Sequence, residues 1–237
     1  MPRTEPLRTA GDGEHEVKYA LAPSAVSTVE GWLRRCCRPD PAFPEGMVSS
    51  LYFDTHCRSF LHEKLNSDFL KSKVRVRWYG DIHSGKPGSA SFVEAKLKTG
   101  GRRAKVRIRS DIPGERLAQI SLADPCLMRI PHALRPHGVT FEKPLFPVFQ
   151  LDYRRQRFIE PTTGCRISLD YHIHVSRTNP QTVPHMRPAR LNRAVLESKG
   201  ALHELPGFLH QLTALGCRKE SFSKYGYCFV KLLNSDI

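Results

Sequence analysis

Charged and apolar residues alternate along at least five separate segments of the chain. These segments are residues 14–21, 71–80, 91–100, 102–110 and 194–200. A β-strand sends successive side chains to opposite faces, so each segment predicts a strand with one ionic face and one apolar face. A single strand of this kind is usually a surface strand whose ionic face meets water. Five of them predict a functional ionic face, and a closed barrel lined with Lys, Arg and Glu would bind a polyanion with its metal ions.

Other segments surround this sheet with further strands and helices. Apolar spacing predicts a helix over residues 25–37 and a short helical link over residues 57–65. Further strands are expected at 47–55, 146–160 and 165–175, an exposed loop at 176–193, two modest helices within the insert 112–144, and C-terminal helices at 203–216 and 223–233.

Short turns join most of these strands in meander order, which predicts antiparallel pairing. The expected fold is α+β and mainly β: an antiparallel, eight-stranded closed tunnel barrel with peripheral and C-terminal helices. We expect residues 14–237 to form one domain, preceded by a disordered tail over residues 1–13, which are polar and contain Pro and Gly.

The charge of the chain indicates an anionic partner. The 237 residues carry a formal net charge of +14, and 40% of them are hydrophobic, which is enough for a substantial core. Nucleic acid, phosphorylated metabolites, polyphosphate and an acidic membrane surface would all match this charge. A protein that is merely basic is the alternative, but here the bases are in phase with the strands instead of lying in a tail.

The chain shows no sign of export or of a thiol-bound metal. The first residues have no apolar signal core, and no segment approaches the roughly 20 apolar residues that span a bilayer, so we expect a cytoplasmic protein. The seven cysteines include no CxxC pair, so they are expected to be free thiols, and a zinc site is disfavoured.

Two arginines on one strand offer the clearest phosphate-binding pattern. Arg75 and Arg77 are two residues apart, so their side chains lie about 7 Å apart on one face and could hold neighbouring phosphates. A solvated outer face would explain the same pattern equally well. If the two arginines were buried, they would require an anion or carboxylates beside them.

Five carboxylates fall within the ionic alternation: Glu14, Glu16, Glu94, Asp170 and Glu197. Hard cations such as Mg²⁺ or Mn²⁺ prefer carboxylate and phosphate oxygens, so a few carboxylates among many bases match a metal–triphosphate site. The alternative is that each carboxylate only pairs with a base on the neighbouring strand.

Other chemistries are less well supported. Residues 102–110 are basic enough to contact nucleic acid, but aromatic residues do not interleave with the ionic face, and helix-turn-helix, zinc-finger and RNP patterns are absent. We therefore expect no nucleic-acid partner. P-loop, GxSxG and HExxH motifs are absent as well.

Several motifs, taken in order, resemble those of a known family. EHEVK resembles the ExExK pattern that opens the triphosphate tunnel metalloenzymes. KVRVRWYG, FVEAKLK, AKVRIR, YRRQRF, CRISLD, AVLESK and ESFSKYGY follow in the order of the VTC domain, the catalytic module of vacuolar transporter chaperone polyphosphate polymerases. The resemblance covers about residues 14–230.

The resemblance implies an antiparallel barrel that moves the terminal phosphate of ATP onto a polyphosphate chain, with Mn²⁺ or Mg²⁺ as cofactor. ATP, polyphosphate and pyrophosphate would be its anionic ligands. By motif, the implied catalytic residues are Arg75, Arg77, Lys96, Arg155 and Arg166; the substrate-binding residues are Lys18, Lys105, Lys199, Ser223 and Lys224; and the metal ligands are Glu197, Glu16 and Glu14.

The sequence departs from the family at two points. The SPX domain and membrane helices of the eukaryotic proteins are missing, so a separate membrane protein is a possible partner. The family can also show a lysine two residues before the serine of FSKY, where this chain has Ser221, with Lys219 nearby as a potential substitute.

Three functions remain open from the sequence. A polyphosphate polymerase-like phosphotransferase is the leading hypothesis. A metal-dependent inorganic triphosphatase or nucleoside triphosphatase of the same fold would use water as acceptor. A non-catalytic polyphosphate-binding protein would need bases but no metal carboxylate, so Glu197 argues against it.

Overall fold

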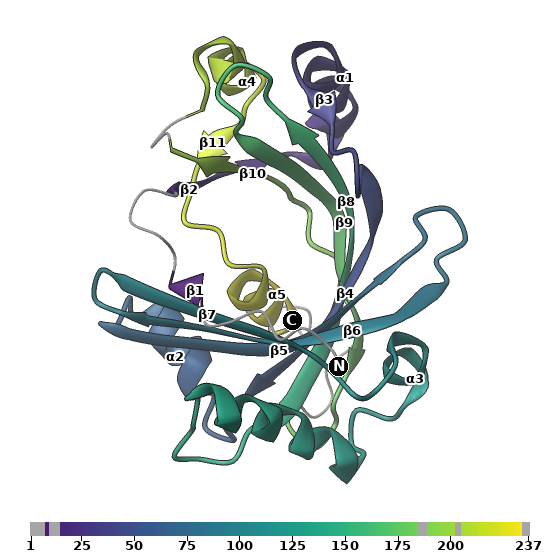
Figure 1. The fold of residues 1–237 in the computed structure, drawn as a ribbon, viewed down its shortest axis with the longest axis vertical. Helices are drawn as coiled ribbons and strands as arrows, with labels where there is room; N and C mark the ends of the chain where they lie inside the picture. Colours follow the sequence, from purple (N-terminus) through teal and green to yellow (C-terminus); the bar gives the residue numbers. More distant parts are fainter. Residues whose placement is uncertain (1–7, 10–14, 184–188, 202–204, 234–237) are drawn as a thin grey trace.

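The computed structural model describes residues 8–9, 15–183, 189–201 and 205–233, and its main feature is one large β-sheet (Figure 1). The strands are β1 (Arg8–Thr9), β2 (His15–Leu21), β3 (Arg38–Pro39), β4 (Glu45–Asp54), β5 (Leu70–Gly80), β6 (Pro87–Thr99), β7 (Arg102–Arg109), β8 (Phe146–Ile159), β9 (Arg166–Thr178), β10 (Ala194–Gly200) and β11 (Arg218–Lys219). Eight of these strands have seven residues or more, which agrees with the expected number.

The strands form a single antiparallel path in the order β1-β7-β6-β5-β4-β8-β9-β10-β2-β11, with β3 attached to β8. The sheet curls, so that β10 and β2 lie across from β5, β6 and β7 (Figure 1). The mainly antiparallel β architecture is therefore confirmed. Among the described residues the path ends at β1 and β11 without a hydrogen-bonded closure, so the curl is an incomplete ring, whereas a closed barrel was expected.

The helices cover the sheet at three places. They are η1 (Pro23–Ala25), α1 (Val26–Cys36), α2 (Ser59–Leu65), α3 (Gly114–Gln119), η2 (Pro125–His137), η3 (Gly207–His210), α4 (Gln211–Ala214) and α5 (Lys224–Leu233). The predicted helices at 25–37, 57–65 and 223–233 are confirmed within one or two residues. The second half of the insert is a 3₁₀-helix because Pro131 and Pro136 lie within it and remove backbone donors.

The insert 112–144 covers the apolar outer face of β4–β7. Trp78 and Val93 of the sheet pack with Leu117 of α3 and Leu127 of η2 in one buried cluster. A Cβ added at Gly114 would lie 2.1 Å from the carbonyl oxygen of Gly88, so α3 rests directly on β6. This contact buries the outer face and leaves the ionic face on the concave side.

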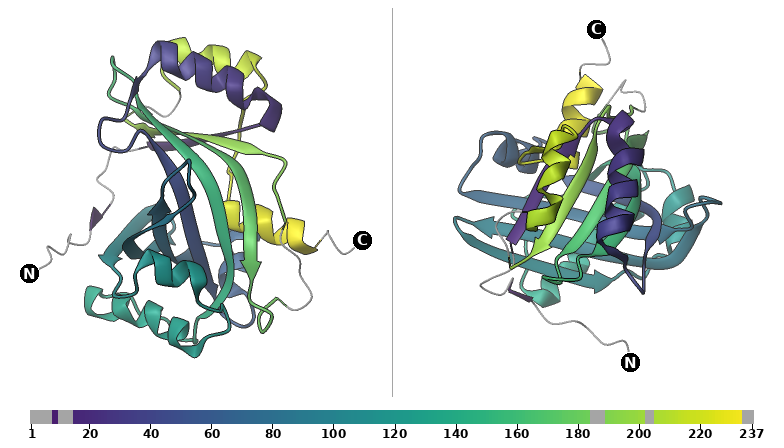
Figure 2. Two further views of the ribbon diagram at one scale, coloured as in Figure 1. Left: turned by 90° about the vertical axis from the view of Figure 1, so that its right-hand side faces the viewer. Right: turned by 90° about the horizontal axis from the view of Figure 1, so that it is seen from above.

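A second helical layer covers the outer face of the other half of the sheet. Val29 and Leu33 of α1 pack with Leu196 of β10 and Leu212 of α4. Figure 2 shows α1 and the α4 segment side by side over this end of the molecule. The two halves of the sheet are thus covered from outside by different helices.

Helix α5 lies inside the curl of the sheet (Figure 1). Tyr225 and Phe229 of α5 pack against Tyr52 and Phe149, with Tyr52 and Tyr225 stacked at 5.2 Å between ring centroids. The Tyr225 hydroxyl donates to buried Asp54 at 2.8 Å, and Asp54 also accepts backbone N–H groups at the start of α2. One part of the concave face is therefore apolar and filled by α5.

The cysteines and helices fit the remaining expectations. All seven cysteines are free thiols, as expected, and Cys37, Cys165, Cys217 and Cys228 are buried. In the part of the chain that the structure describes, no helix has both the length and the apolar character needed to cross a membrane.

Candidate active site

Alternate side chains of β5, β6 and β7 form successive rows across the concave face. The cross-strand register defines an arginine row of Arg75, Glu94 and Arg107, a lysine row of Lys73, Lys96 and Lys105, and an outer row of Lys71, Lys98 and Arg103. Like charges directly opposite each other on neighbouring strands repel. The lysine and outer rows contain only bases, so this face is built for an anion.

Glu94 is the centre of the arginine row. It is 3% exposed, and Arg75 donates to it from Nε at 2.7 Å and contacts it from Nη2 at 2.6 Å. Arg107 Nε lies 3.6 Å and Arg77 Nη1 4.0 Å from the same carboxylate. Although burial opposes ionisation, Arg75, Arg77 and Lys105 hold the pKa of Glu94 well below its usual value. Glu94 is thus an ionised structural anchor that orients three arginines.

Hydroxyl groups of the neighbouring strands fix Arg75 and Arg77 further. Arg75 donates to the Tyr52 hydroxyl at 3.4 Å, and Arg77 donates to Ser50 at 3.1 Å and to the Tyr153 hydroxyl at 3.0 Å. Both arginines are buried, so the alternative interpretation that they lie on a solvated outer face is wrong. Ser50 and Tyr52 were missed in the sequence because their segment lacks alternating charges, and only the register of β4 with β5 places them here. Tyr153 opens the YRRQRF motif but was not singled out, although it alternates with Arg155 and Arg157.

A second ionic cluster joins β8, β9 and the beginning of α5. Asp170 is fully buried, accepts two hydrogen bonds from Arg155 at 2.6 and 2.7 Å, and contacts Lys224 Nζ at 2.6 Å. Burial opposes ionisation of Asp170, but Arg155 and Lys224 lower its pKa to about 2. For Asp170 and Glu94, pairing with neighbouring bases is therefore confirmed. Ser223 accepts the N–H of Gly226 at 3.2 Å and so caps α5 beside Lys224.

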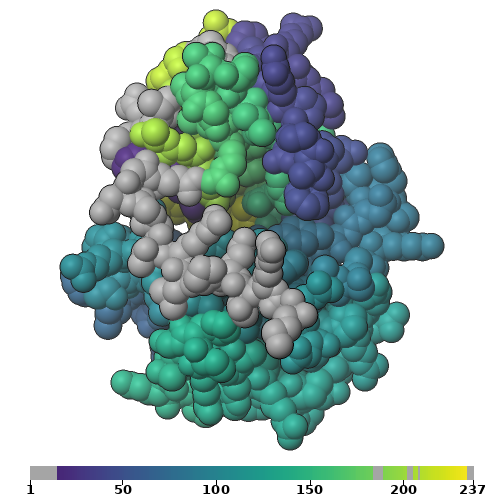
Figure 3. Space-filling model, in the orientation of Figure 1, coloured from purple at the N-terminus to yellow at the C-terminus, as the bar shows by residue number. Residues whose placement is uncertain are grey.

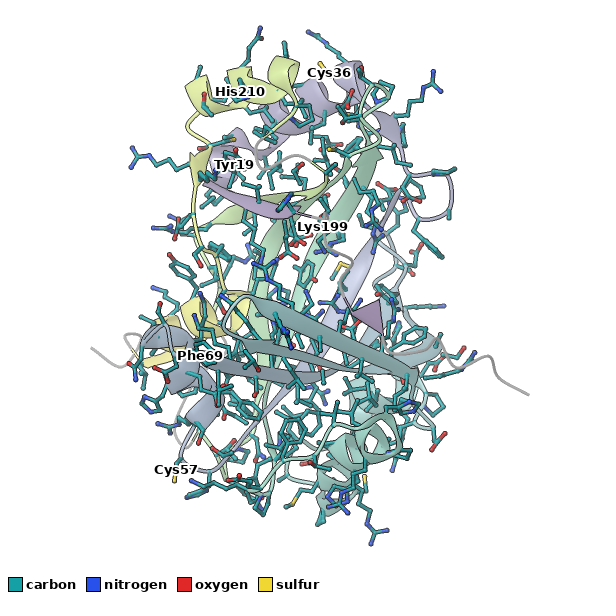
Figure 4. All side chains as sticks on the ribbon, turned by 60° about the vertical axis from the view of Figure 1, so that its left-hand side comes forward. Tyr19, Cys36, Cys57, Phe69, Lys199 and His210 are labelled. Carbon is teal, nitrogen blue, oxygen red and sulfur yellow. The ribbon has the colours of Figure 1, made fainter. Side chains whose placement is uncertain are left out.

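The third cluster, on β2 and β10, contains the carboxylates expected to bind metal. Glu197 contacts Lys199 Nζ at 2.7 Å, and Glu16 contacts Lys18 Nζ at 2.7 Å. Lys96 and Lys199 also approach Glu16, at 3.8 and 3.6 Å. Figure 4 shows Lys199 in the space between the upper strands and the β5–β7 group. This cluster therefore faces the lysine row across the curl.

Glu16 and Glu197 also act on each other. Burial opposes ionisation of both, and the charge of Glu197 also opposes ionisation of Glu16. The surrounding lysines nevertheless lower the pKa of Glu16 to about 2, and the neighbouring lysines and Arg155 hold the pKa of Glu197 well below its usual value. Both remain anionic at neutral pH. Glu14, the third expected ligand, lies outside the described residues.

Two neighbouring carboxylates fit a divalent cation that also binds a phosphorylated substrate. No group of three or more His, Cys, Asp or Glu side chains among the described residues could hold a metal without other ligands. Mg²⁺ commonly binds through one or two carboxylates together with substrate phosphates and water. Glu16 and Glu197 are the candidates for such a pair, and the bases that contact them are lysines, whereas the guanidinium of Arg155 binds both oxygens of fully buried Asp170.

Two more expected residues lie towards the edges of the concave face. Lys105 is exposed at the end of the lysine row, and Arg166 is exposed at the start of β9, opposite Lys199. Lys219 is exposed on β11 opposite Tyr19, which packs in the outer cluster with α1, so Lys219 is on the outer side of the sheet. It is Lys64 of α2 that donates to Ser221, at 3.1 Å, and sequence spacing gave no signal for this contact.

The space-filling view shows a hollow on one face of the molecule, between the upper strands and the β5–β7 half, with yellow atoms of the C-terminal segment inside it (Figure 3). Arg75, Arg77, Arg155, Lys224 and the β2–β10 carboxylates therefore converge on the concave side from five elements. Chemically, the arrangement can neutralise a chain of phosphates and hold a divalent cation against it.

Comparisons with known proteins agree with this geometry. Residues 13–233 match the VTC domain family. No curated protein matches the chain. A "putative adenylate cyclase" from Bacillus halodurans shares the fold with a TM-score of 0.51 and 13% identity, over 89% of this chain and 95% of the other.

A second solved structure has the same fold. The "putative adenylyl cyclase" HpAC1 from Hippeastrum, described as having a dominant triphosphatase activity, has a TM-score of 0.51 and 18% identity, over 92% of this chain and 95% of its own. At this level of identity the two structures show the fold, which is that of the triphosphate tunnel metalloenzymes. Because the family match spans nearly all of the chain, the protein belongs to the VTC domain family.

Proposed function

We propose that the protein is a metal-dependent phosphotransferase that moves the γ-phosphate of ATP onto a polyphosphate chain. The observation that carries this proposal is the length of the basic track on β5–β7. The arginine, lysine and outer rows follow one another at two-residue steps, so the outer row lies about 13 Å along the strands from the arginine row. Three linked phosphates are shorter than this track, whereas a polyphosphate chain would occupy all of it.

The side chains would act mainly by positioning and charge neutralisation, which is what phosphoryl transfer requires. Arg75, Arg77 and Arg155 have their guanidinium planes fixed by Glu94, Tyr153 and Asp170, so they need little reorganisation when phosphates bind. Lys18, Lys199 and Lys224 would add charge from the opposite strands and from α5, with Arg166 and Lys105 at the edges.

Glu16 and Glu197 would hold Mn²⁺ or Mg²⁺, with Glu14 as a further candidate. The cation would neutralise charge on the phosphates of the bound nucleotide. The acceptor is the terminal phosphate of the chain, which is already anionic, so the transfer needs neither a covalent nucleophile nor a general base. Its oxygen forms a bond to the γ-phosphorus, the bond from that phosphorus to the bridging oxygen breaks, and ADP leaves with the electron pair. We place this reaction in the cytoplasm, where ATP is abundant and free thiols stay reduced.

Hydrolysis is the second candidate, and the HpAC1 description favours it, because a protein of this fold is described there as mainly a triphosphatase. Water would then be the acceptor at the same carboxylates and arginines. The two reactions differ in their products: transfer gives ADP and chain phosphates, and hydrolysis gives orthophosphate.

Phosphorus-31 NMR of the protein with ATP and Mn²⁺ tests the proposal. We expect ADP and a growing signal from internal chain phosphates. Orthophosphate alone would replace transfer with hydrolysis, and unchanged ATP with folded protein would leave a binding function.

Glu197→Gln separates catalysis from binding. The variant removes one carboxylate charge, so we expect turnover to fall by at least 100-fold, while metal-free polyphosphate binding persists because the bases remain. Glu115→Gln, on the exposed surface of α3, is the matched control and should behave as the wild type. A Glu197→Gln protein with normal turnover would remove this carboxylate from the proposed metal site.

A further inference from the structure

Two aromatic side chains lie at the end of the concave face that is opposite the outer row. Tyr79 of β5 alternates with Arg77 and Arg75, and Phe92 of β6 alternates with Glu94, so both are on the ionic side of the sheet. Arg77 and Phe92 are direct cross-strand partners. Both rings are half-buried, and their centroids are 6.4 Å apart at an angle of 64°. The sequence was interpreted as having no aromatic residues interleaved with the ionic face, but at this end Tyr79 and Phe92 lie on it.

Two arginines lie against these rings. Arg107 is stacked over Phe92, with Cζ 4.0 Å from the ring centroid, and its Nη2 donates to the Tyr79 hydroxyl at 3.3 Å. Arg157 of β8 lies over Tyr79, with Cζ 5.9 Å from the centroid. Tyr79, Phe92, Arg107 and Arg157 together are called the platform. Aromatic rings and guanidinium planes are the groups on which proteins stack nucleobases.

The platform is continuous with the phosphate-binding residues. Arg107 belongs to both, since its Nε lies 3.6 Å from Glu94 in the arginine row. Phe92 and Glu94 are one two-residue step apart, which is about 7 Å along the strand. A flat group on the platform would thus be joined to phosphates at Arg75 and Arg77 by a linker of about the size of a ribose.

The concave face of β5–β7 therefore has a direction. It begins with aromatic rings and arginines, continues through the arginine row, and ends in the lysine and outer rows. The Tyr52 ring of β4 lies 5.0 Å from Lys73, but it is buried in the cluster around α5 and not half-exposed like Tyr79 and Phe92. A nucleoside triphosphate has the same order of chemistry, with a flat base at one end and a chain of charge at the other.

We propose that the platform binds the base of a nucleoside triphosphate by stacking, so that its phosphates point along β5–β7 towards the outer row. The inference rests on the proposed function and specifies which end of the track receives the nucleotide. Because stacking uses the face of the base, ATP and GTP bind with similar affinity. The polyphosphate acceptor then approaches from the outer row, where the basic side chains are Lys71, Lys98 and Arg103.

Binding of two phosphorylated ligands tests this proposal. Titration calorimetry in EDTA, which prevents turnover, measures the affinities for ATP and for inorganic tripolyphosphate. Phe92→Ala should weaken ATP binding by roughly 5- to 100-fold, the usual effect of removing one stacking partner. Tripolyphosphate has no base, so its affinity should stay within about twofold.

Two further variants control for indirect effects. Phe92→Trp keeps a flat ring and should retain ATP affinity, because stacking requires only the ring. A side chain that acted only on the stability of the fold would not need to be a ring. Phe69→Ala removes an exposed phenylalanine near the other end of β5 (Figure 4) and should change neither affinity.

The outcomes separate the two proposals. If Phe92→Ala leaves ATP binding unchanged, or weakens ATP and tripolyphosphate by the same factor, the platform does not bind the base. If the wild-type protein binds neither ligand, or binds both and transfers no phosphate in the NMR assay, the proposed function fails instead. Selective loss of ATP affinity in Phe92→Ala supports the platform whether the acceptor is polyphosphate or water.

Discussion

Glu94 provides the sharpest test of how the ionic face is held together. It is the one carboxylate in the arginine row, and Arg75, Arg77 and Arg107 all lie within 4.0 Å of it. Glu94→Gln keeps the shape of the side chain and removes its charge. Three guanidinium groups would then share a mostly buried site without a counter-charge.

The expected cost is large for a single substitution. Breaking a buried ion pair by removing one partner typically costs about 3–5 kcal/mol, because the remaining charge stays desolvated. For a protein of this size, 1 kcal/mol corresponds to about 2–4 °C in the melting temperature, so the variant should melt roughly 6–20 °C below the wild type. Glu115→Gln, whose side chain is exposed, should shift the melting temperature by less than about 2 °C.

Thermal unfolding with and without tripolyphosphate is the assay. The ligand should raise the melting temperature of Glu94→Gln more than that of the wild type, because its phosphates replace the lost counter-charge. Since the arginines hold the pKa of Glu94 low in the folded state, its stabilisation is present above the pKa of an unfolded glutamate and is lost as the pH falls towards the folded pKa. The two melting temperatures should therefore converge in acid. A variant that melts with the wild type at pH 7 would refute the role of Glu94 as an anchor.

Two other predictions concern α5 and the lysine row. Tyr225→Phe removes the hydroxyl that donates to Asp54 at 2.8 Å and leaves a buried carboxylate short of a partner, so urea unfolding should show a loss of about 1–3 kcal/mol, and no loss would mean that packing alone holds α5. Burial lowers the pKa of Lys73 to about 7, and the positive charges of Arg75 and two lysines add to this effect, whereas Tyr52 opposes it. Lys73 is therefore charged below pH 7 and loses its proton above pH 7. Tripolyphosphate affinity in EDTA should thus fall between pH 6 and pH 8 with proton uptake on binding, and Lys73→Met should flatten this part of the profile; an unchanged profile in the variant would assign the titration to another group.

The sequence predicts the sheet well because charge alternation has the period of a strand. The segments around Arg75, Glu94 and Glu197 show this pattern clearly, and all of them form strands with the ionic side inward. The helix at 25–37 was also predictable, since Val29 and Leu33 recur at helical spacing and are buried.

Features set by register and curvature could not be predicted. Ser50 and Tyr52 bind the arginines because β4 pairs with β5 in one particular register, and nothing in their local sequence marks them as ionic partners. The contact of Lys64 with Ser221 joins residues 157 positions apart, which no local pattern encodes. Whether hydrogen bonds close the barrel could not be predicted, because alternation reports faces and carries no information about how two sheet edges meet.

Phe92 shows a different limit. The residue has the period of Glu94 and Lys96, so alternation places it on the ionic side, opposite to Val93, which the insert 112–144 covers. The sequence does not show that Tyr79 and Arg107 lie against its ring, because those contacts depend on how β5, β6 and β7 pair.

The position of β2 in the sheet has a consequence for how the chain folds. This strand lies between β10 and β11, so residues near the beginning of the sequence pair with residues about 180 positions later. Strands β4 to β7 are neighbours in sequence and, with the insert that follows them, can assemble from local contacts, which form quickly. Pairing of β2 and docking of α5 must wait for the last part of the chain. During synthesis on the ribosome, the half that carries Glu16 and Glu197 would consequently form after the other half, because it requires β10 and α5 to have been made.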